Sequence, residues 1–387
     1  MAFLRIDTSG LPVIQSDAGG GLPVNIVNIM WAGGSAYSSV HKVHQQILSQ
    51  AEPGARISSW LLQGRGSCCS AESTREWQLS HRLLKGRHLW VLLRPWLHGR
   101  LREALEQANA QVLVLDGLGV SRLILPVVQK MPDVRAAIVF HGKTRLRRAD
   151  VALLRAIPSS RLSIVAVSQT LASALEQDLG IPVNVLRTAL EPKGFRRGLL
   201  EPEQARLALN LPTRGVRVMG AVGRLVDSKG FDYLLEAFAQ ASQQQPDLRL
   251  VILGEGVQRA LLEGRLKALG LVDKVSMPGH CNGLAQLYRA FDWVLIPSHA
   301  EGLGLVLQEA VMAEVPVLCS DLSVFREQLG DAGLYAPAGD PQAWAKAIID
   351  CTALPAEQVA VAQQQALAPD QAWQSFSQAS RELLRTP

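Results

Sequence analysis

The sequence reads WVLIPSHAEGLGLVLQEAVMAEVPVLCSD over residues 293–321, and this stretch decides the fold. Its apolar run at residues 293–297 predicts a buried strand, and a glycine-containing loop follows. Residues 304–313 then predict a helix and residues 315–319 a second strand. Two apolar strands joined through a helix are typical of a parallel sheet with helices on both faces. The stretch therefore favours a doubly wound α/β fold.

The same alternation extends in both directions. Further strands are predicted at residues 23–31, 88–93, 111–115, 135–140, 162–167, 183–186, 216–222, 248–253 and 274–277. Helices are predicted at residues 37–48, 97–107, 171–179, 231–242, 257–269 and 284–290, with Ser168 as the cap of the third. The polar residues 63–78 predict a loop, and prolines and charges place a linker near residues 187–200.

The chain has 387 residues, a length typical of two domains at roughly 100–200 residues each. We expect two doubly wound, Rossmann-like domains that face a cleft, an N-terminal one over residues 1–195 and a C-terminal one over residues 196–370. The last helix, residues 371–387, is expected to pack back onto the N-terminal domain. Ligands of such sheets bind beyond the carboxyl ends of the strands, so the cleft is the expected active site.

Composition excludes several classes of protein. Hydrophobic residues make up 48% of the chain and charged residues 19%, which argues against long disorder. No apolar window approaches the roughly 18 residues of a membrane-spanning helix, and the first residues lack the pattern of a signal peptide. The five cysteines form no C-x-x-C pair, so they indicate neither a zinc site nor a disulfide framework. These features predict a cytoplasmic protein.

Charge is unevenly distributed along the chain. Residues 1–200 hold 24 Lys and Arg against 13 Asp and Glu, whereas residues 201–387 hold 15 against 21. Basic residues gather near Trp77, Trp90 and Trp96 in three clusters: Arg82, Lys85, Arg87 and His88; Arg94, His98, Arg100 and Arg102; and Lys143, Arg145, Arg147 and Arg148. Such a surface suits the anionic cytoplasmic face of the inner membrane or a phosphorylated glycolipid. A solvated face around core tryptophans is the alternative, and no nucleic-acid motif accompanies the charge.

The first motif, GRLVDSKG, lies at residues 223–230, between a predicted strand and a predicted helix. Glycine lets a backbone approach a ligand closely, and the amides at a helix start favour an anion. Arg224 offers a planar fork for phosphate and Lys229 a compact positive charge. The motif therefore suits a diphosphate, and the alternative is a surface turn with two solvated bases.

The second motif, SHAEGLGLVLQEA, lies at residues 298–310 and follows the strand at residues 293–297. Glu301 falls in its glycine loop and Glu309 in the following helix. Such carboxylates accept hydrogen bonds from sugar or ribose hydroxyls, and the loop amides suit a phosphate or a hexose oxygen. The alternative is a helix N-terminus stabilised by acidic residues.

In combination, the motifs resemble the retaining GT-B glycosyltransferases of family 4, the glycosyl transferases group 1. The resemblance covers roughly residues 216–345 and is carried by GRLVDSKGFDYLLEAF, LRLVILGEG, the opening stretch quoted above and GDAGLYAPAGD. Residues 1–200 resemble the family in outline. Leu303 stands where the family usually has Phe, and Asp321-Leu322 replaces a common glycine pair.

The resemblance implies transfer of a hexosyl group from a nucleotide diphosphate sugar to a glycan or glycolipid, with retention of the anomeric configuration. The expected acceptor belongs to lipopolysaccharide core or other cell-envelope polysaccharide synthesis. The implied catalytic residues are Arg224 and Lys229 at the leaving diphosphate, Glu301 at the donor sugar, and His141 reaching that sugar from the N-terminal domain. The implied donor-binding residues are Gly33, Gly34, Gly223, Gly302, Leu303, Gly304 and, at the ribose, Glu309.

Some alternatives stay open at this point. The glycines at residues 19–21 compete with Gly33 and Gly34 for the phosphate loop, and His141 is alternatively a structural cap. The sequence contains no Asp-x-Asp, so a metal is not needed for the diphosphate; no metal and no cofactor beyond the donor are expected. Two other classes of function remain, a nucleotide-sugar epimerase of the same architecture and a catalytically silent nucleotide-sugar binding module.

Overall fold

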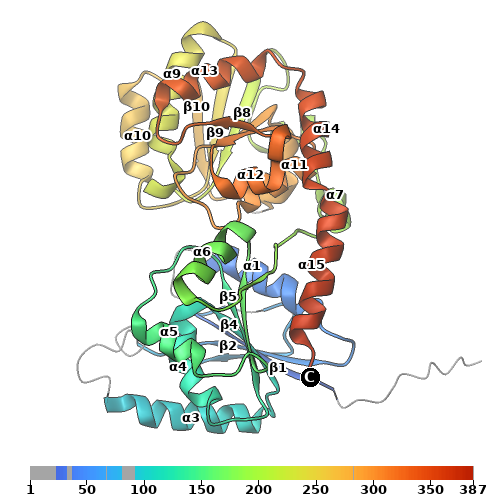
Figure 1. The fold of residues 1–387 in the computed structure, drawn as a ribbon. Helices are drawn as coiled ribbons and strands as arrows, with labels where there is room; N and C mark the ends of the chain where they lie inside the picture. The colour runs from blue at the N-terminus through green and yellow to red at the C-terminus, as the bar shows by residue number, and fades with distance from the viewer. Residues whose placement is uncertain (1–22, 33–36, 67, 81–91, 282, 387) are drawn as a thin grey trace, which may run out of the picture.

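A computed structural model describes residues 23–32, 37–66, 68–80, 92–281 and 283–386 of the chain. The described residues form two parallel β-sheets, each packed with helices, one above the other in Figure 1. The predicted α/β class is therefore confirmed. We call the seven-stranded sheet with its helices the N-terminal unit and the six-stranded sheet with its helices the C-terminal unit.

The N-terminal sheet has the strand order β3-β2-β1-β4-β5-β6-β7, and its neighbouring strands pair in parallel. This is a doubly wound order that starts in the middle of the sheet and extends to both edges. The strands are β1 (Asn25–Met30), β2 (Arg56–Leu61), β3 (Ser73–Glu76), β4 (Val112–Asp116), β5 (Arg135–Phe140), β6 (Leu162–Ala166) and β7 (Asn184–Val185). The helices are α1 (Tyr37–Leu48), α3 (Arg94–Gln107), α4 (Gly117–Val128), α5 (Arg148–Arg155) and α6 (Gln169–Leu179).

The C-terminal sheet repeats this order as β10-β9-β8-β11-β12-β13. Its strands are β8 (Arg217–Val222), β9 (Leu248–Leu253), β10 (Val275–Gly279), β11 (Trp293–Ile296), β12 (Val317–Ser320) and β13 (Leu334–Ala336). Its helices are α8 (Pro202–Ala208), α9 (Phe231–Gln244), α10 (Arg259–Ala268), α11 (Leu305–Met312), α12 (Ser323–Leu329), α13 (Pro341–Thr352) and α14 (Ala356–Leu367). All four residues of β11 are buried, as expected for a central parallel strand that is covered on both faces.

The chain crosses between the units twice. The first crossing follows β7 and contains α7 (Pro192–Gly198) within the predicted linker. The second crossing leads into α15 (Pro369–Leu384), which runs along the N-terminal unit in Figure 1. Phe376 and Leu384 on α15 are buried in the apolar cluster that also holds β1 and β4. The exact limits of the two domains stay predictions.

Several predicted elements differ from the structure. The predicted loop at residues 63–78 contains strand β3, and the predicted helix at residues 284–290 is a pair of 3-10 turns, Leu284–Gln286 and Tyr288–Ala290. Of the predicted strand at residues 88–93, only Leu92 and Leu93 are described, and both lie in a helical turn before α3. By contrast, Ser168 caps α6 as predicted, because its Oγ accepts the backbone N–H of Leu171 at 3.3 Å.

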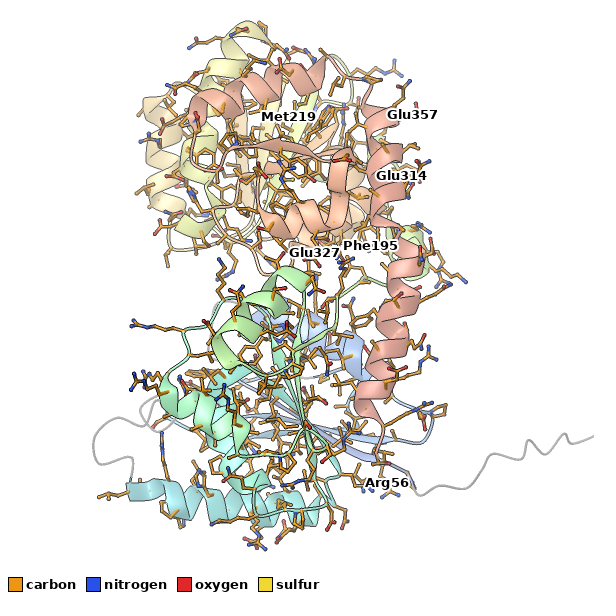
Figure 2. All side chains as sticks on the ribbon, in the orientation of Figure 1. Arg56, Phe195, Met219, Glu314, Glu327 and Glu357 are labelled. Atoms are coloured by element: carbon orange, nitrogen blue, oxygen red, sulfur yellow. The ribbon has the colours of Figure 1, made fainter. Side chains whose placement is uncertain are left out.

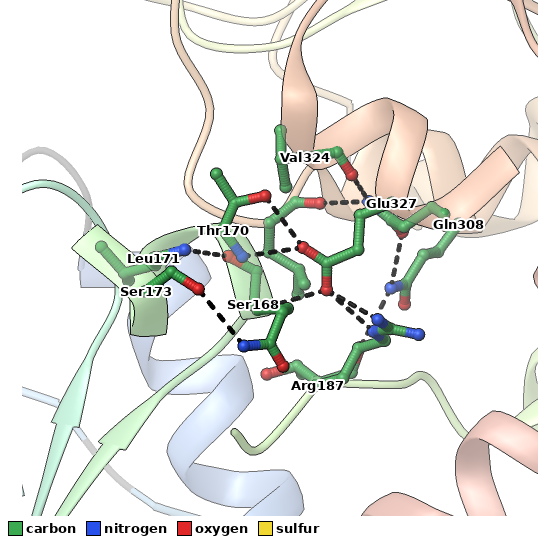
Figure 3. Close-up of polar contacts among 12 residues, drawn as sticks. Ser168, Thr170, Leu171, Ser173, Arg187, Gln308, Val324 and Glu327 are labelled. Carbon is green, nitrogen blue, oxygen red and sulfur yellow. Dashed lines mark hydrogen bonds and ion pairs between the residues drawn. The ribbon is translucent and has the colours of Figure 1, made fainter. Parts of the chain in front are cut away.

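The carboxylate of Glu327 forms bonds that connect the two units. Glu327 on α12 lies at the edge of the C-terminal unit that faces the N-terminal unit (Figure 2). It accepts the backbone amides of Gln169 and Thr170 at 2.9 and 3.0 Å, at the start of α6 (Figure 3). It also accepts the Thr170 hydroxyl at 3.1 Å and the Arg187 guanidinium at 2.8 Å. An anion at a helix N-terminus satisfies donors that the helix itself leaves without partners.

The charge on Glu327 should therefore contribute to stability in a pH-dependent way. Burial works to raise the pKa of this carboxyl, but the two amides and Arg187 outweigh it, so the pKa is lowered. Because the pKa of this carboxyl is lower in the folded than in the unfolded chain, its charge contributes fully to folding stability above the unfolded-state pKa of about 4.3. That contribution is lost as the pH falls through the folded-state pKa.

We expect Glu327→Gln to lower the free energy of unfolding by about 2 kcal/mol at pH 7, since charged hydrogen bonds are lost. The deficit relative to the native chain should shrink as the pH falls below about 4.3. Urea denaturation across a pH series measures both effects. Asp321→Asn is the matched control, because Asp321 pairs with Arg326 in solvent and such pairs contribute little. A deficit that stays constant with pH would contradict the assignment.

Candidate functional site

A cavity of about 240 Å³ lies where the two units meet. The N-terminal unit lines it with Ser39, Val40, Val43, His141 and Val167. The C-terminal unit lines it with Gly223, Arg224, Lys229, Glu301, Gly302, Leu303, Gly304, Leu305 and Val306. His141 follows β5, Gly223 follows β8 and Glu301 follows β11, so the cavity lies beyond the carboxyl ends of strands in both sheets.

The loop after β8 brings its basic residues against the loop after β11. Gly230 has a φ of +67°, and a Cβ there would lie 2.1 Å from the carbonyl oxygen of Pro297. Only glycine permits this backbone conformation together with such close contact between the two loops. The contact places Lys229 beside Glu301, with which it forms an ion pair. The two predicted motifs are thus adjacent in space.

Glu301 is held from two sides. The Lys229 ammonium donates to its Oε1, and the Ser298 hydroxyl donates to the same oxygen at 2.8 Å. The side chains of Lys229 and Glu301 are 16% and 11% exposed, so the pair is shielded from bulk water but open to the cavity. An ammonium has three N–H donors, so Lys229 can bind Glu301 and an anionic ligand at the same time.

Glu309 is buried behind the lining and is not one of the lining residues. One carboxylate oxygen accepts the Lys42 ammonium at 3.1 Å, and the other accepts the Tyr288 hydroxyl at 2.7 Å. Burial and the negative charge of Glu309 together raise the pKa of Tyr288 well above its usual value. Lys42 comes from α1, so this ion pair also joins the two units.

His141 belongs to a buried polar cluster in the N-terminal unit. Its Nε2 lies 3.1 Å from Nε2 of His44 and 4.0 Å from Oδ1 of Asp116. Burial lowers the pKa of His141 to about 4 and raises the pKa of Asp116 to about 6. Burial also lowers the pKa of His44, and the neighbouring His141 adds to that effect. At neutral pH His141 is therefore an uncharged hydrogen-bonding group at the cavity wall.

The predicted site residues divide into three groups. The structure brings His141, Arg224, Lys229, Glu301, Gly223, Gly302, Leu303 and Gly304 to one cavity. Glu309 is buried and is not among the residues that line this cavity. Gly33, Gly34 and the competing glycines at residues 19–21 lie outside the described residues, so their assignment stays a prediction.

Part of the chain matches a known protein family. Residues 210–367 match the family glycosyl transferases group 1. The group 1 segment includes both motifs and every lining residue that the C-terminal unit contributes. The match therefore concerns the unit that supplies the Arg224, Lys229 and Glu301 side chains of the cavity.

Similar proteins also match this chain over part of its length. A D-inositol 3-phosphate glycosyltransferase of Segniliparus rotundus is 32% identical over 175 residues, which are 42% of this chain and 39% of that protein. The lipopolysaccharide core biosynthesis mannosyltransferase LpsB of Rhizobium meliloti is 25% identical over 254 residues, 58% of this chain and 70% of that protein. This chain thus matches less than two thirds of the first relative.

A solved structure resembles the chain over nearly its whole length. Anabaena Alr3699/HepE, crystallised in complex with UDP, has a TM-score of 0.73 at 17% identity and covers 93% of this chain and 98% of its own. This likeness concerns the fold alone, and it shows the GT-B architecture of two Rossmann-like domains that was expected.

Sequence reasoning missed Lys42, His44, Asp116 and Tyr288, all of which contact predicted site residues. The sequence could have predicted Asp116 as a site residue, because it ends a strand and ligands bind at the carboxyl ends of parallel strands. Lys42 and His44 lie inside a helix, where no local motif marks them. Tyr288 was assigned to a helix, although it lies in a 3-10 turn.

Within the described part of the chain, none of the helices has both the length and the apolarity needed to cross a bilayer. Leu92, Leu93 and Trp96 are nevertheless exposed at the start of α3, with exposed fractions of 73%, 44% and 59%. The Arg100 guanidinium lies 5.1 Å from the centre of a Trp96 ring. This part of the N-terminal unit therefore combines apolar and basic side chains on its surface.

Proposed function

We propose that this protein is a retaining glycosyltransferase that moves a hexosyl group from a nucleotide diphosphate sugar to a glycan or glycolipid. The observation that carries the proposal is the arrangement of Arg224, Lys229 and Glu301 around one cavity between two Rossmann-like units. The match of this segment to glycosyl transferases group 1 supports it. The alternatives, an epimerase and a silent binding module, become outcomes of the test below.

In this proposal Arg224 and Lys229 bind the diphosphate and stabilise the negative charge that develops as it leaves. Glu301 fixes the position of Lys229 through their ion pair. Its Oε1 is already bound by Lys229 and Ser298, which favours an orienting role over a covalent nucleophile. The anomeric configuration is then retained, because the acceptor attacks the sugar on the same face from which the diphosphate leaves. Diphosphate binding needs no metal in this scheme.

The other predicted residues surround the donor. Uncharged His141 offers a hydrogen bond to the sugar from the N-terminal unit. The amides of Gly302, Leu303 and Gly304 face the sugar and phosphate. Glu309 receives the ribose hydroxyls, and for this Lys42 has to move aside or share the carboxylate, because its ammonium binds Oε1.

The proposed acceptor is a lipid-linked cell-envelope glycan, such as the growing lipopolysaccharide core. The basic N-terminal half and the exposed Leu92, Leu93 and Trp96 support docking at an anionic membrane surface. Similarity to a protein named as a lipopolysaccharide core mannosyltransferase supports the same acceptor class. Co-sedimentation with vesicles containing anionic lipid checks the docking, and equal binding to neutral vesicles would contradict it.

The donor site is tested by thermal unfolding with UDP, GDP, ADP and their sugars. A ligand at about 100 times its Kd stabilises by about 2.7 kcal/mol, which raises the Tm of a chain of this length by about 3 °C if it unfolds as one unit. We expect this shift with one nucleotide family and its loss in Arg224→Ala and Glu309→Ala. Lys267→Ala is the matched control, because Lys267 is exposed on α10 and does not line the cavity.

Each other outcome has a definite meaning. A shift that persists in both Arg224→Ala and Glu309→Ala places the donor elsewhere and contradicts the proposed site. A sugar product of changed configuration, formed without any acceptor, identifies an epimerase. Tight nucleotide binding without turnover, in the presence of a range of glycan acceptors, identifies a binding module.

A further inference from the structure

Three side chains from separate elements of the N-terminal unit converge at His141, which lines the cavity. His44 comes from α1, Asp116 from the end of β4 and His141 from the loop after β5. One nitrogen from each imidazole and one oxygen of the carboxylate all lie within 4.8 Å of one another. His44 is fully buried, and the side chains of His141 and Asp116 are only 15% and 18% exposed. Solvated surface groups are seldom arranged in this way.

The neighbours of this cluster fix which atoms face its centre. Asn28 donates from Nδ2 to the Ser59 hydroxyl at 3.3 Å, which directs its Oδ1 toward His44. His44 Nδ1 lies 2.7 Å from that oxygen and donates to it. The lone pair of His44 is then on Nε2, the nitrogen that faces His141. The backbone N–H of Trp31 donates to Oδ2 of Asp116 at 3.3 Å, which leaves Oδ1 on the side of His141.

This is the environment in which histidine binds a metal. A metal-bound imidazole almost always donates its other ring N–H to a carboxylate, a carbonyl oxygen or water, and the amide oxygen of Asn28 is such a partner for His44. Two imidazoles and one carboxylate are the ligands of zinc-type ions, whereas magnesium and calcium prefer sites made of oxygen atoms.

The distances also suit a metal. Two ligand atoms bound at about 2.1 Å in a tetrahedral site lie about 3.4 Å apart. The distance of 3.1 Å between the two Nε2 atoms and the distance of 4.0 Å from His141 to Asp116 bracket this value. The third distance, between His44 and Asp116, is within 4.8 Å, so side-chain movements of about an ångström bring the three atoms into a coordination sphere.

We propose that His44, Asp116 and His141 form a binding site for one divalent transition-metal ion of the zinc type. Three protein ligands leave a further coordination position for water or another ligand. The site is separate from the expected diphosphate site at Arg224 and Lys229, so it does not replace the expectation that diphosphate binding is metal-independent. Occupation would engage Nε2 of His141 and leave Nδ1 for contacts in the cavity.

The test is Co²⁺ binding to the full chain after treatment with a chelator. Tetrahedral Co²⁺ absorbs in the visible region, and a bound thiolate adds an ultraviolet charge-transfer band. We expect one equivalent with the visible bands and no thiolate band. Asp116→Asn, which keeps the shape of the side chain, should weaken binding by about 100-fold or more, and Asn28→Ala by about 10–100-fold.

Two matched controls test alternative metal sites. His280→Gln removes an exposed histidine outside the cluster, and Cys69→Ser removes an exposed thiol. Both should bind Co²⁺ like the native chain. Failure of the native chain to bind one equivalent overturns the proposal, and so does undiminished binding in Asp116→Asn. If Asp116→Asn fails to fold, the native spectrum decides, because a thiolate band would place the ion at a cysteine.

The proposal does not depend on the transferase activity. The nucleotide thermal shift, measured on the same samples with and without metal, reports on the donor site alone. A chain that binds Co²⁺ but no nucleotide would retain the metal site and lose the proposed function. A chain that binds nucleotide but no Co²⁺ would keep the proposed function and overturn the metal site.

Discussion

Replacing Lys229 with alanine should lower kcat/KM for the proposed hexosyl transfer by about 10³-fold, the loss expected when one preorganised charge is removed from a developing anion. The Lys229 side chain is only 16% exposed and lines the cavity beside Arg224. Water therefore screens it weakly, and its attraction to a leaving diphosphate is stronger than that of a surface lysine. Steady-state kinetics with the donor identified by thermal unfolding measure the change.

The partner of Lys229 complicates this experiment and also provides its control. Removing the ammonium leaves Glu301 without its ion-pair partner, so the variant loses the pair as well as the charge at the diphosphate. A double-mutant cycle compares kcat/KM in Lys229→Ala, Glu301→Gln and the double variant. It separates the effect of removing the positive charge near the diphosphate from the effect of breaking the Lys229–Glu301 ion pair. If Lys229→Ala loses less than tenfold while it remains folded, Lys229 does not stabilise the leaving group.

Replacing Gly302 with alanine should lower kcat/KM by about 100-fold without unfolding either unit. A Cβ at Gly302 would lie 2.0 Å from the carbonyl oxygen of His141, which belongs to the other unit. Gly302 is not one of the glycines with positive φ, so alanine meets no backbone strain of its own. The clash is with backbone, so the loops that carry Gly302 and His141 have to shift apart where the donor is expected to bind.

This effect is measured by kinetics together with small-angle X-ray scattering, which should show a slightly larger radius of gyration. Gly264→Ala is the matched control, because a Cβ there meets nothing within 4 Å and the position is inside α10. That variant should keep full activity and gain about 0.5–1 kcal/mol of stability. Full activity in Gly302→Ala would show that the close contact between the units plays no part in transfer.

The sequence predicted the elements that carry strong local signals. The apolar strands and the two glycine motifs are visible in short windows, and parallel topology brings the ends of those strands to one edge. Glu301 and Lys229 were therefore expected in one cleft, and the structure pairs them. Ser168 was expected as a helix cap because its hydroxyl precedes an apolar helix, and it makes that bond.

The elements that the sequence did not predict lack such signals. All four residues of β3 are exposed, so this edge strand shows no apolar alternation. Helix α4 contains glycines near its start and Pro126 in its interior, which argue against a helix, yet most of its residues are buried. Tertiary packing here outweighs local propensity. The contacts of Lys42 and His44 depend on partners distant in the sequence, which no local pattern reveals.

The path of α15 has a consequence for biosynthesis. A ribosome makes β1 to β7 long before it makes Phe376 and Leu384, which complete the apolar cluster of the N-terminal unit. Until then, the surface that these side chains cover stays open to water. Exposed apolar surface on a partly made chain is prone to aggregation and is a substrate for chaperones. The N-terminal unit is thus translated first but becomes complete only after the C-terminal unit has been synthesised.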